Sequence, residues 1–355
     1  MSHRAVVVLA CLAMIAPLAV GTTSRHLTTR RSLELATAPS NGHRLATGLP
    51  SYPASDATAP VGVVPESTAS PSRGPSPSSH SPSPSAPTAP PASPSAGGPT
   101  PPIRAAFFYP WYPESWYPTS HFTPTLGAPY DASSQAVINY QLAAMLYANI
   151  DVGIASWWGP GTPTDSRIPL LLAAAAGTHL KWALYYEPAP GTQASDLAYI
   201  YNRYANSPSY ERVDGKPVLF VYSRSVASCA DAANWVSVNS GRFYLDLQVF
   251  SGYRSCPIQP DQWHQYAPAE RQDEQVGHSF SVSPGFWLYS SSTPLLARDP
   301  VAFAQAVREM VASGEPWQLI TTWNEWGEGT AVEDAVQWQS ADPYGQYVDI
   351  LHANP

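Results

Sequence analysis

Short β-rich runs alternate with helix-like stretches from residue 103 onward in this 355-residue chain. Alternation over about 250 residues is typical of a parallel (β/α)8 barrel, or TIM barrel, and a doubly wound sheet is the alternative. The sequence therefore predicts one α/β domain, and its pattern is least regular at the strand 262–266 and at the helix expected to follow that strand. The predicted strands are Ile103–Tyr109, Val152–Ser156, Lys181–Tyr186, Pro217–Val221, Phe243–Val249, Gln262–Tyr266, Ser279–Val282 and Gln318–Thr322. The predicted helices are Ser133–Ala148, Ile168–Gly177, Ser195–Ala205, Ser228–Val238 and Pro300–Ser313.

The first 21 residues have the pattern of a secretory signal peptide. A short basic start precedes the apolar run Ala5–Val20, and small residues end at Gly21, where a signal peptidase would cut. We expect cleavage there and a secreted, extracellular protein. Two alternatives stay open: an uncleaved anchor, although the run is short for a membrane span, and a lipid attached at Cys11. Either would associate the protein with the membrane or cell wall.

Residues 22–102 are dominated by proline, serine, alanine and threonine, and large apolar residues are nearly absent after Val64. Such a segment cannot bury enough apolar surface to offset the entropy lost on ordering. We therefore predict a disordered, extended linker between the signal peptide and a folded domain at 103–355.

Charge and motif content exclude several classes of function. The net charge of −8 and the lack of a basic run argue against a nucleic-acid or anionic-membrane partner. The histidines are scattered without metal-ligand spacing, and there is no phosphate-binding glycine loop or Gly-x-Ser-x-Gly elbow. We therefore expect no metal, no cofactor, no integral membrane partner and a monomer. Cys229 and Cys256 follow the fourth and fifth predicted strands, and we expect them to form a disulfide.

The segment Trp323–Thr330 carries the strongest chemical signal. It follows an apolar run and sets Glu325 and Glu328 three residues apart among tryptophans and glycines. Two carboxylates in an aromatic cleft are the usual means of breaking a glycosidic bond, with one as acid and the other as base, nucleophile or charge stabiliser. A structural hydrogen-bonding pair is the alternative, but two charges among tryptophans are costly without a function.

Aromatic and polar residues also collect after several predicted strands. In a barrel these positions converge on one face, where such enzymes place their active sites. A core-capping role is the alternative for any single cluster, whereas several in succession favour a sugar-binding cleft. The predicted substrate-binding residues are Tyr109, Trp111, Tyr112, Trp157, Trp158, Tyr186, Glu187, Asn324 and Trp326.

A series of motifs resembles glycoside hydrolase family 99, the endo-α-mannosidases and endo-α-mannanases. The similarity runs in order from about Ile103 to Glu333, and the block 323–330 is its most specific part. The motifs are Tyr109–Tyr112, His121–Gly127, Ile150–Trp158, Tyr185–Pro188, Asp214–Pro217, Ser283–Gly285 and Trp323–Thr330.

The resemblance implies a (β/α)8 barrel that cleaves an internal α-mannoside with retention and without metal. It implies that Glu325 is a base toward the sugar's own 2-hydroxyl, giving a 1,2-anhydro sugar, and that Glu328 is the general acid and base. It places Tyr109 or Tyr112 near the reacting centre. A tryptophan at 157 or 158 would stack on a sugar, and Glu187 would accept a hydroxyl hydrogen bond.

Two departures from the family pattern bear on substrate identity more than on reaction type. Phe286–Leu288 replaces a polar, acidic stretch, and Gly327 stands where the family commonly has histidine.

Glu333 is expected to open the final helix or to orient the two glutamates. Two other functions remain open: a non-catalytic carbohydrate-binding barrel at the cell surface, and an endo-hydrolase of a different α-linked wall polysaccharide.

Overall fold

The computed structural model describes residues 100–355 except 189–190 and 224–225. The predicted signal peptide and the predicted linker up to residue 99 lie outside the described residues. The first strand begins at Ile103, where the folded domain was predicted to start.

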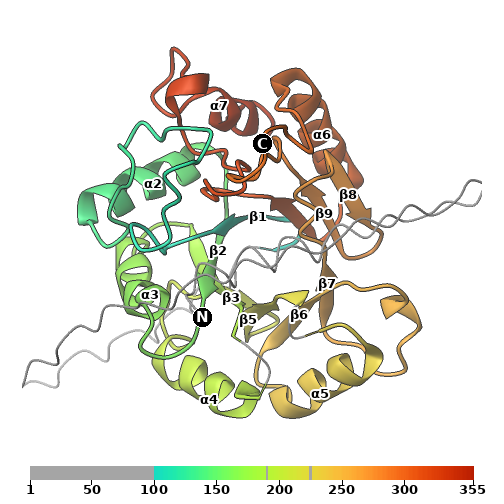
Figure 1. Ribbon diagram of the computed structural model, residues 1–355. Coiled ribbons are helices and arrows are strands. Elements are labelled where there is room, and N and C mark those ends of the chain that lie inside the picture. The colour runs from blue at the N-terminus through green and yellow to red at the C-terminus, as the bar shows by residue number, and fades with distance from the viewer. Residues whose placement is uncertain (1–99, 189–190, 224–225) are drawn as a thin grey trace, which may run out of the picture. The chain divides into compact units, whose positions relative to one another are not determined.

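Eight parallel strands form a sheet that is nearly closed into a barrel, with helices around it (Figure 1). Their order is β7-β6-β5-β3-β2-β1-β10-β9, and each predicted strand is present with its ends shifted by two residues or fewer. The α/β barrel prediction is therefore confirmed. The strands are β1 (Ile103–Phe108), β2 (Val152–Trp157), β3 (Lys181–Tyr186), β5 (Lys216–Val221), β6 (Tyr244–Gln248), β7 (Gln262–His264), β9 (Ser279–Val282) and β10 (Trp317–Ile320).

The seam of the barrel lies between β7 and β9. In the described residues no backbone ladder joins these two strands, and side chains bridge them instead. Ser281 Oγ on β9 donates to the carbonyl of Gln265, and Ser283 Oγ donates to the carbonyl of Pro268 at 2.8 Å. Hydroxyl donors thus satisfy carbonyls that a continuous ladder would have used.

Two short strands add to the barrel. β4 (Arg212–Val213) forms a hairpin with β5 through Asp214 and Gly215, which have φ angles of 51° and 76° as such a tight turn requires. β8 (Gln272–Gln275) pairs antiparallel with β9.

In the described residues no α-helix follows β6 or β7, so the predicted helix after 262–266 is wrong. The 3-10 turn η2 (Tyr253–Ser255) follows β6, in a segment punctuated by Gly252, Pro257 and Pro260. Glycine and proline at this density disfavour a continuous helix.

The helices lie outside the strands, and most agree with the sequence patterns. The exception is α3, which begins five residues before the predicted Ile168. Pro163 occupies its first turn, and Thr162 Oγ1 caps it by accepting from the amide of Asp165 at 3.3 Å. None of the described helices is long and apolar enough to span a bilayer. The helices are α2 (Gln135–Tyr147), α3 (Pro163–Ala174), α4 (Gln193–Arg203), α5 (Cys229–Asn239), α6 (Pro300–Ser313) and α7 (Gln346–His352).

Candidate active site

We call the loop after β10, residues 321–335, the catalytic loop because it carries both predicted catalytic glutamates. It is tied to the end of β1. The amide of Trp323 donates to the carbonyl of Phe107 at 2.7 Å. The Asn324 side chain then pairs with the backbone of Tyr109 in both directions, accepting from its amide at 2.7 Å and donating to its carbonyl at 3.1 Å. Asn324 is fully buried, so its role in the structure is to fix the loop on the barrel rim.

Glu325 is almost fully buried, with 2% of its surface exposed. Its Oε1 accepts from the amide of Gly327 at 2.9 Å, and its Oε2 has no hydrogen-bond partner among the described residues. Burial raises the pKa of Glu325 well above its ordinary value, and the charge of Glu328 raises it further. The carboxylate is thus held near a second carboxylate with one oxygen unpaired, as a base that must take up a proton requires.

Glu328 lies at the end of a chain of tyrosine hydroxyls. Tyr266 donates to Glu328 Oε2 at 2.9 Å, and Tyr109 donates to Tyr266 at 2.9 Å. Burial raises the pKa of Tyr109, and the charges of Glu187, Glu328 and Glu325 add to this, so Tyr109 lies near all three carboxylates. Tyr266 was not among the predicted site residues, although it ends the predicted strand 262–266, where barrel sites are built.

A row of aromatic rings leads from Tyr109 to Glu187. The rings of Tyr109 and Trp111 lie 4.3 Å apart, and those of Trp111 and Trp158 lie 5.0 Å apart. Trp158 Nε1 donates to Glu187 Oε2 at 3.0 Å. The structure therefore brings these four predicted residues together, and Glu187 raises the pKa of Glu325 as well. Their contact with substrate stays a prediction.

Tyr112 and Trp326, also predicted to bind substrate, support the catalytic loop from within the core. Tyr112 Oη donates to the carbonyl of Asn324 at 3.0 Å and accepts from the amide of Trp326 at 3.1 Å. The Trp326 ring is fully buried and stacks on Trp338, with centroids 6.1 Å apart.

Trp157 and Tyr186 lie on the helix side of the sheet, away from Glu325 and Glu328. Trp157 Nε1 donates to Asp165 on α3 at 2.8 Å, and Tyr186 donates to Asp196 on α4 at 2.8 Å. Tyr185 instead faces the barrel interior and packs against Phe107, with the two ring centroids 5.0 Å apart. Because strand side chains alternate between faces, the tyrosine beside the predicted one is the one directed inward.

Glu333 does not open the final helix, which begins at Gln346, so that part of the expectation is wrong, and its role in orienting the two glutamates stays a prediction. It is buried in the catalytic loop, where Oε2 accepts from Tyr130 at 2.8 Å and Oε1 accepts from Gln141 on α2 at 2.7 Å. Tyr130 in turn accepts from Asn324 Nδ2 at 3.0 Å. Glu333 thus acts on the loop through Tyr130, and burial raises its pKa to about 7.

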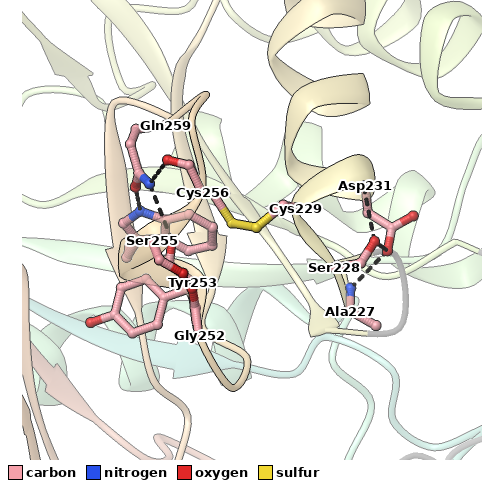
Figure 2. Close-up of a disulfide and its surroundings, with 10 residues drawn as sticks. Ala227, Ser228, Cys229, Asp231, Gly252, Tyr253, Ser255, Cys256 and Gln259 are labelled. Atoms are coloured by element: carbon pink, nitrogen blue, oxygen red, sulfur yellow. Dashed lines mark hydrogen bonds between the residues drawn. A yellow bond between two sulfur atoms is a disulfide. The ribbon is translucent and has the colours of Figure 1, made fainter.

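The predicted disulfide is present. Cys229 in the first turn of α5 is bonded to Cys256 in the loop after β6, with Cα atoms 5.2 Å apart (Figure 2). Ser228 caps α5 beside it, and Gln259 Nε2 donates to the carbonyl of Cys256 at 2.7 Å. The bond therefore pins the loop after β6 to the helix that follows β5. Among the described residues, no group of three or more His, Cys, Asp and Glu side chains is arranged to hold a metal ion.

Comparison with known proteins relates the chain to one family. The family model described as glycosyl hydrolase family 99 matches residues 117–252. The chain is also 28% identical over 285 residues to the glycoprotein endo-alpha-1,2-mannosidase of Mus musculus, and 22% identical over 290 residues to that of Xenopus laevis. The chain is a distant relative of family 99. The matches cover 66% of this chain and 61% and 63% of the two relatives, so it spans about three fifths of their length.

A solved structure supports the same fold. The family 99 endo-alpha-mannosidase of Bacteroides thetaiotaomicron superposes with a TM-score of 0.57 at 20% identity, covering 70% of this chain and 95% of that one. The barrel is therefore the fold of this family 99 neighbour. The residues matched by the family model end before Glu325.

Proposed function

We propose that the chain is a secreted, endo-acting glycoside hydrolase that cleaves internal α-mannosidic bonds in a glycan or polysaccharide with retention. The observation that carries this proposal is the buried pair Glu325 and Glu328 on the barrel rim, with one carboxylate bonded to the Tyr109–Tyr266 hydroxyl chain. The relatives named endo-alpha-1,2-mannosidase support the substrate class.

In the first step Glu325 removes the proton of the sugar 2-hydroxyl. The freed oxygen attacks C1 while the bond from C1 to the leaving oxygen breaks, and Glu328 gives its proton to that oxygen. The product at C1 is a 1,2-anhydro sugar. The unpaired Oε2 of Glu325 and its raised pKa suit the uptake of this proton.

In the second step Glu328 removes a proton from water, and the water oxygen attacks C1. The bond between C1 and O2 breaks, and O2 recovers its proton from Glu325. Two displacements at C1 restore the original anomeric configuration, so the proposal requires retention. Tyr266 stabilises the carboxylate form of Glu328 by donating to Oε2 in the interval between its two proton transfers.

Product release from α-mannan and from a panel of other α-linked polysaccharides tests the proposal with the full chain. We expect oligosaccharides from the wild type, an α-configured reducing end by proton NMR, and a loss of about 10³-fold or more in Glu325→Gln and Glu328→Gln. Glu274→Gln, which neutralises an exposed carboxylate on β8, is the matched control and should keep wild-type activity.

A non-catalytic carbohydrate-binding barrel is the second candidate, because the aromatic row from Tyr109 to Trp158 would serve binding alone equally well. Binding of α-mannan without product release by the wild type and both variants would overturn the hydrolase proposal in favour of this one. Cleavage of a different α-linked polysaccharide would keep the reaction and change the substrate.

A further inference from the structure

Two aromatic stacks join the loop after β1 to the loop after β9. Tyr117 stacks on Tyr289 with ring centroids 3.9 Å apart and planes inclined by 16°. His121 stacks on Trp287 at 4.0 Å and 18°, and its Nε2 lies 3.1 Å from the carbonyl oxygen of Leu288. We call Tyr117, His121, Trp287 and Tyr289 the aromatic wall. Tyr117 is buried, and the other three are partly exposed.

The aromatic wall is bonded directly to the catalytic loop. The amide of Trp287 donates to the carbonyl of Glu328 at 2.7 Å, and the amide of Tyr289 donates to the carbonyl of Gly327 at 2.7 Å. The segment after β9 therefore runs alongside the two glutamates like an added strand.

Gly327 allows the wall to approach Glu325. A Cβ at this position would lie 2.7 Å and 3.0 Å from two ring carbons of Tyr117 and 2.9 Å from Glu325 Oε1. Gly327 is absent from the glycines with positive φ, so its backbone conformation does not demand glycine. The glycine is needed for space, because the edge of the Tyr117 ring and the Glu325 carboxylate lie on either side of the point that a side chain would fill.

We propose that the aromatic wall is a specificity-determining surface, on which the sugar unit that meets Glu325 packs the apolar C–H side of its pyranose ring. The inference rests on the proposed hydrolase function and adds the surface that selects the sugar. His121, Trp287 and Tyr289 are partly exposed, and the face of an aromatic ring takes the apolar C–H side of a sugar, with the tyrosine hydroxyl at its rim. With glycine at 327, no side chain of the catalytic loop lies between the Tyr117 ring and the Glu325 carboxylate.

Steady-state kinetics on α-manno-oligosaccharides of defined length test the wall. In Tyr117→Ala and Tyr289→Ala we expect KM to rise about 10-fold, kcat to change less than about 3-fold, and the positions of cleavage to shift. The matched control is Tyr147→Ala, which removes a stack of Tyr147 on His352 of similar geometry (3.9 Å, 9°) between the outer helices α2 and α7. It should keep the wild-type KM and cleavage pattern.

Binding separates failure of this inference from failure of the proposed function. Calorimetry compares Glu328→Gln with the double variant Tyr117→Ala/Glu328→Gln, and about 10-fold weaker binding in the double variant supports the wall even without turnover. If the wild type cleaves mannan while both wall variants keep its KM and cleavage positions, the wall has no role in specificity and the hydrolase proposal stands. If no variant binds any oligosaccharide, both are overturned.

Discussion

Glu325 and Glu328 titrate as a pair, because burial and the charge of Glu328 together raise the pKa of Glu325. Two neighbouring carboxylates cannot both ionise easily, so the pair holds one proton to a higher pH than an isolated carboxylate would. The proposed reaction needs the singly protonated form in which Glu328 carries the proton as acid and Glu325 is ionised as base. The raised pKa of Glu325 favours the other form, with the proton on Glu325, so the reacting form is the less populated of the two. A shared proton thus supplies both roles.

We therefore expect kcat/KM to follow a bell-shaped pH profile whose alkaline limb lies well above the ordinary carboxylate range. Activity falls on that limb as the pH rises through the second pKa of the pair, since the acid is lost. With a substrate whose fluoride leaving group needs no proton, Glu328→Gln should retain the first step, measured as a burst of fluoride release, and that step should lose the alkaline limb. An alkaline limb that persists in this variant would belong to another group.

Gly327 makes a second prediction at this scale. Gly327→Ala adds a Cβ that meets both Tyr117 and Glu325 Oε1 at less than 3 Å, so ring and carboxylate must move apart. A misplacement of about 1 Å costs about 10²-fold in rate, and we expect a loss of kcat of up to that size in steady-state kinetics. Gly161→Ala adds the same methyl where nothing lies within 4 Å, which makes it a space control, although its φ of 75° adds strain. A wild-type kcat in Gly327→Ala would show that the Tyr117 ring and Glu325 do not lie close to position 327.

Individual residues were the harder part to predict from the sequence. Glu325 and Glu328 stand out because two carboxylates lie among tryptophans, and the structure places both on the barrel rim. Tyr266 and Glu333 gain their roles only from contacts with residues far along the chain, 62 positions away for Tyr266 and Glu328. Choosing Tyr185 over Tyr186 requires knowing which face of β3 turns inward, and a fully apolar strand such as β3 gives no alternation to decide it.

At the scale of elements, the eight barrel strands were predictable because most are short runs rich in apolar and aromatic residues between turn residues. β8 was not, since its sequence Gln-Asp-Glu-Gln carries no apolar pattern and its pairing with β9 supplies the order. The loop after β6 replaces a helix for a comparable reason, since glycine and proline interrupt it. The disulfide then holds this loop against the barrel, as the packing of a helix would have done.

Removing that disulfide should destabilise the domain. The bond spans 27 residues, and closing a loop of that length stabilises a fold by about 3 kcal/mol through the entropy of the unfolded chain. We expect Cys229→Ala, Cys256→Ala and the double variant to lose about 2–4 kcal/mol each in chemical unfolding. The three losses should agree within error, because either single change breaks the same bond. A double variant as stable as the oxidised wild type would show that the disulfide does not stabilise the domain.

At the scale of the whole molecule, the two proposed catalytic glutamates lie at one end of the barrel, and another buried carboxylate, Glu211, lies at the opposite end. Glu211 lies beside the start of β3, where its amide donates to the carbonyl of Trp182 at 2.9 Å. It has no exposed surface, and no side chain in the described residues donates to its carboxylate oxygens. Burial raises its pKa to about 8, with Lys181 lowering it and Asp151 raising it to smaller extents.

This raised pKa makes stability depend on pH in a defined direction. Below about pH 4 both folded and unfolded chains hold the proton, so Glu211 costs nothing. As the pH rises toward 8 only the unfolded chain ionises, and the free energy of unfolding falls by up to about 1.4 kcal/mol per pH unit. Glu211→Gln should remove this slope and stabilise the domain by about 2–3 kcal/mol at pH 7, measured by chemical unfolding across pH 4 to 8.

The same substitution should leave the activity profile unchanged, because the bell-shaped profile belongs to Glu325 and Glu328 at the carboxyl ends of the strands, whereas Glu211 lies at an amino end. Activity and stability would then have separate pH dependences within one barrel, each altered by a variant that spares the other. Glu274→Gln, an exposed carboxylate on β8, should change neither. A shift of the activity profile in Glu211→Gln would show that the two ends of the barrel are coupled.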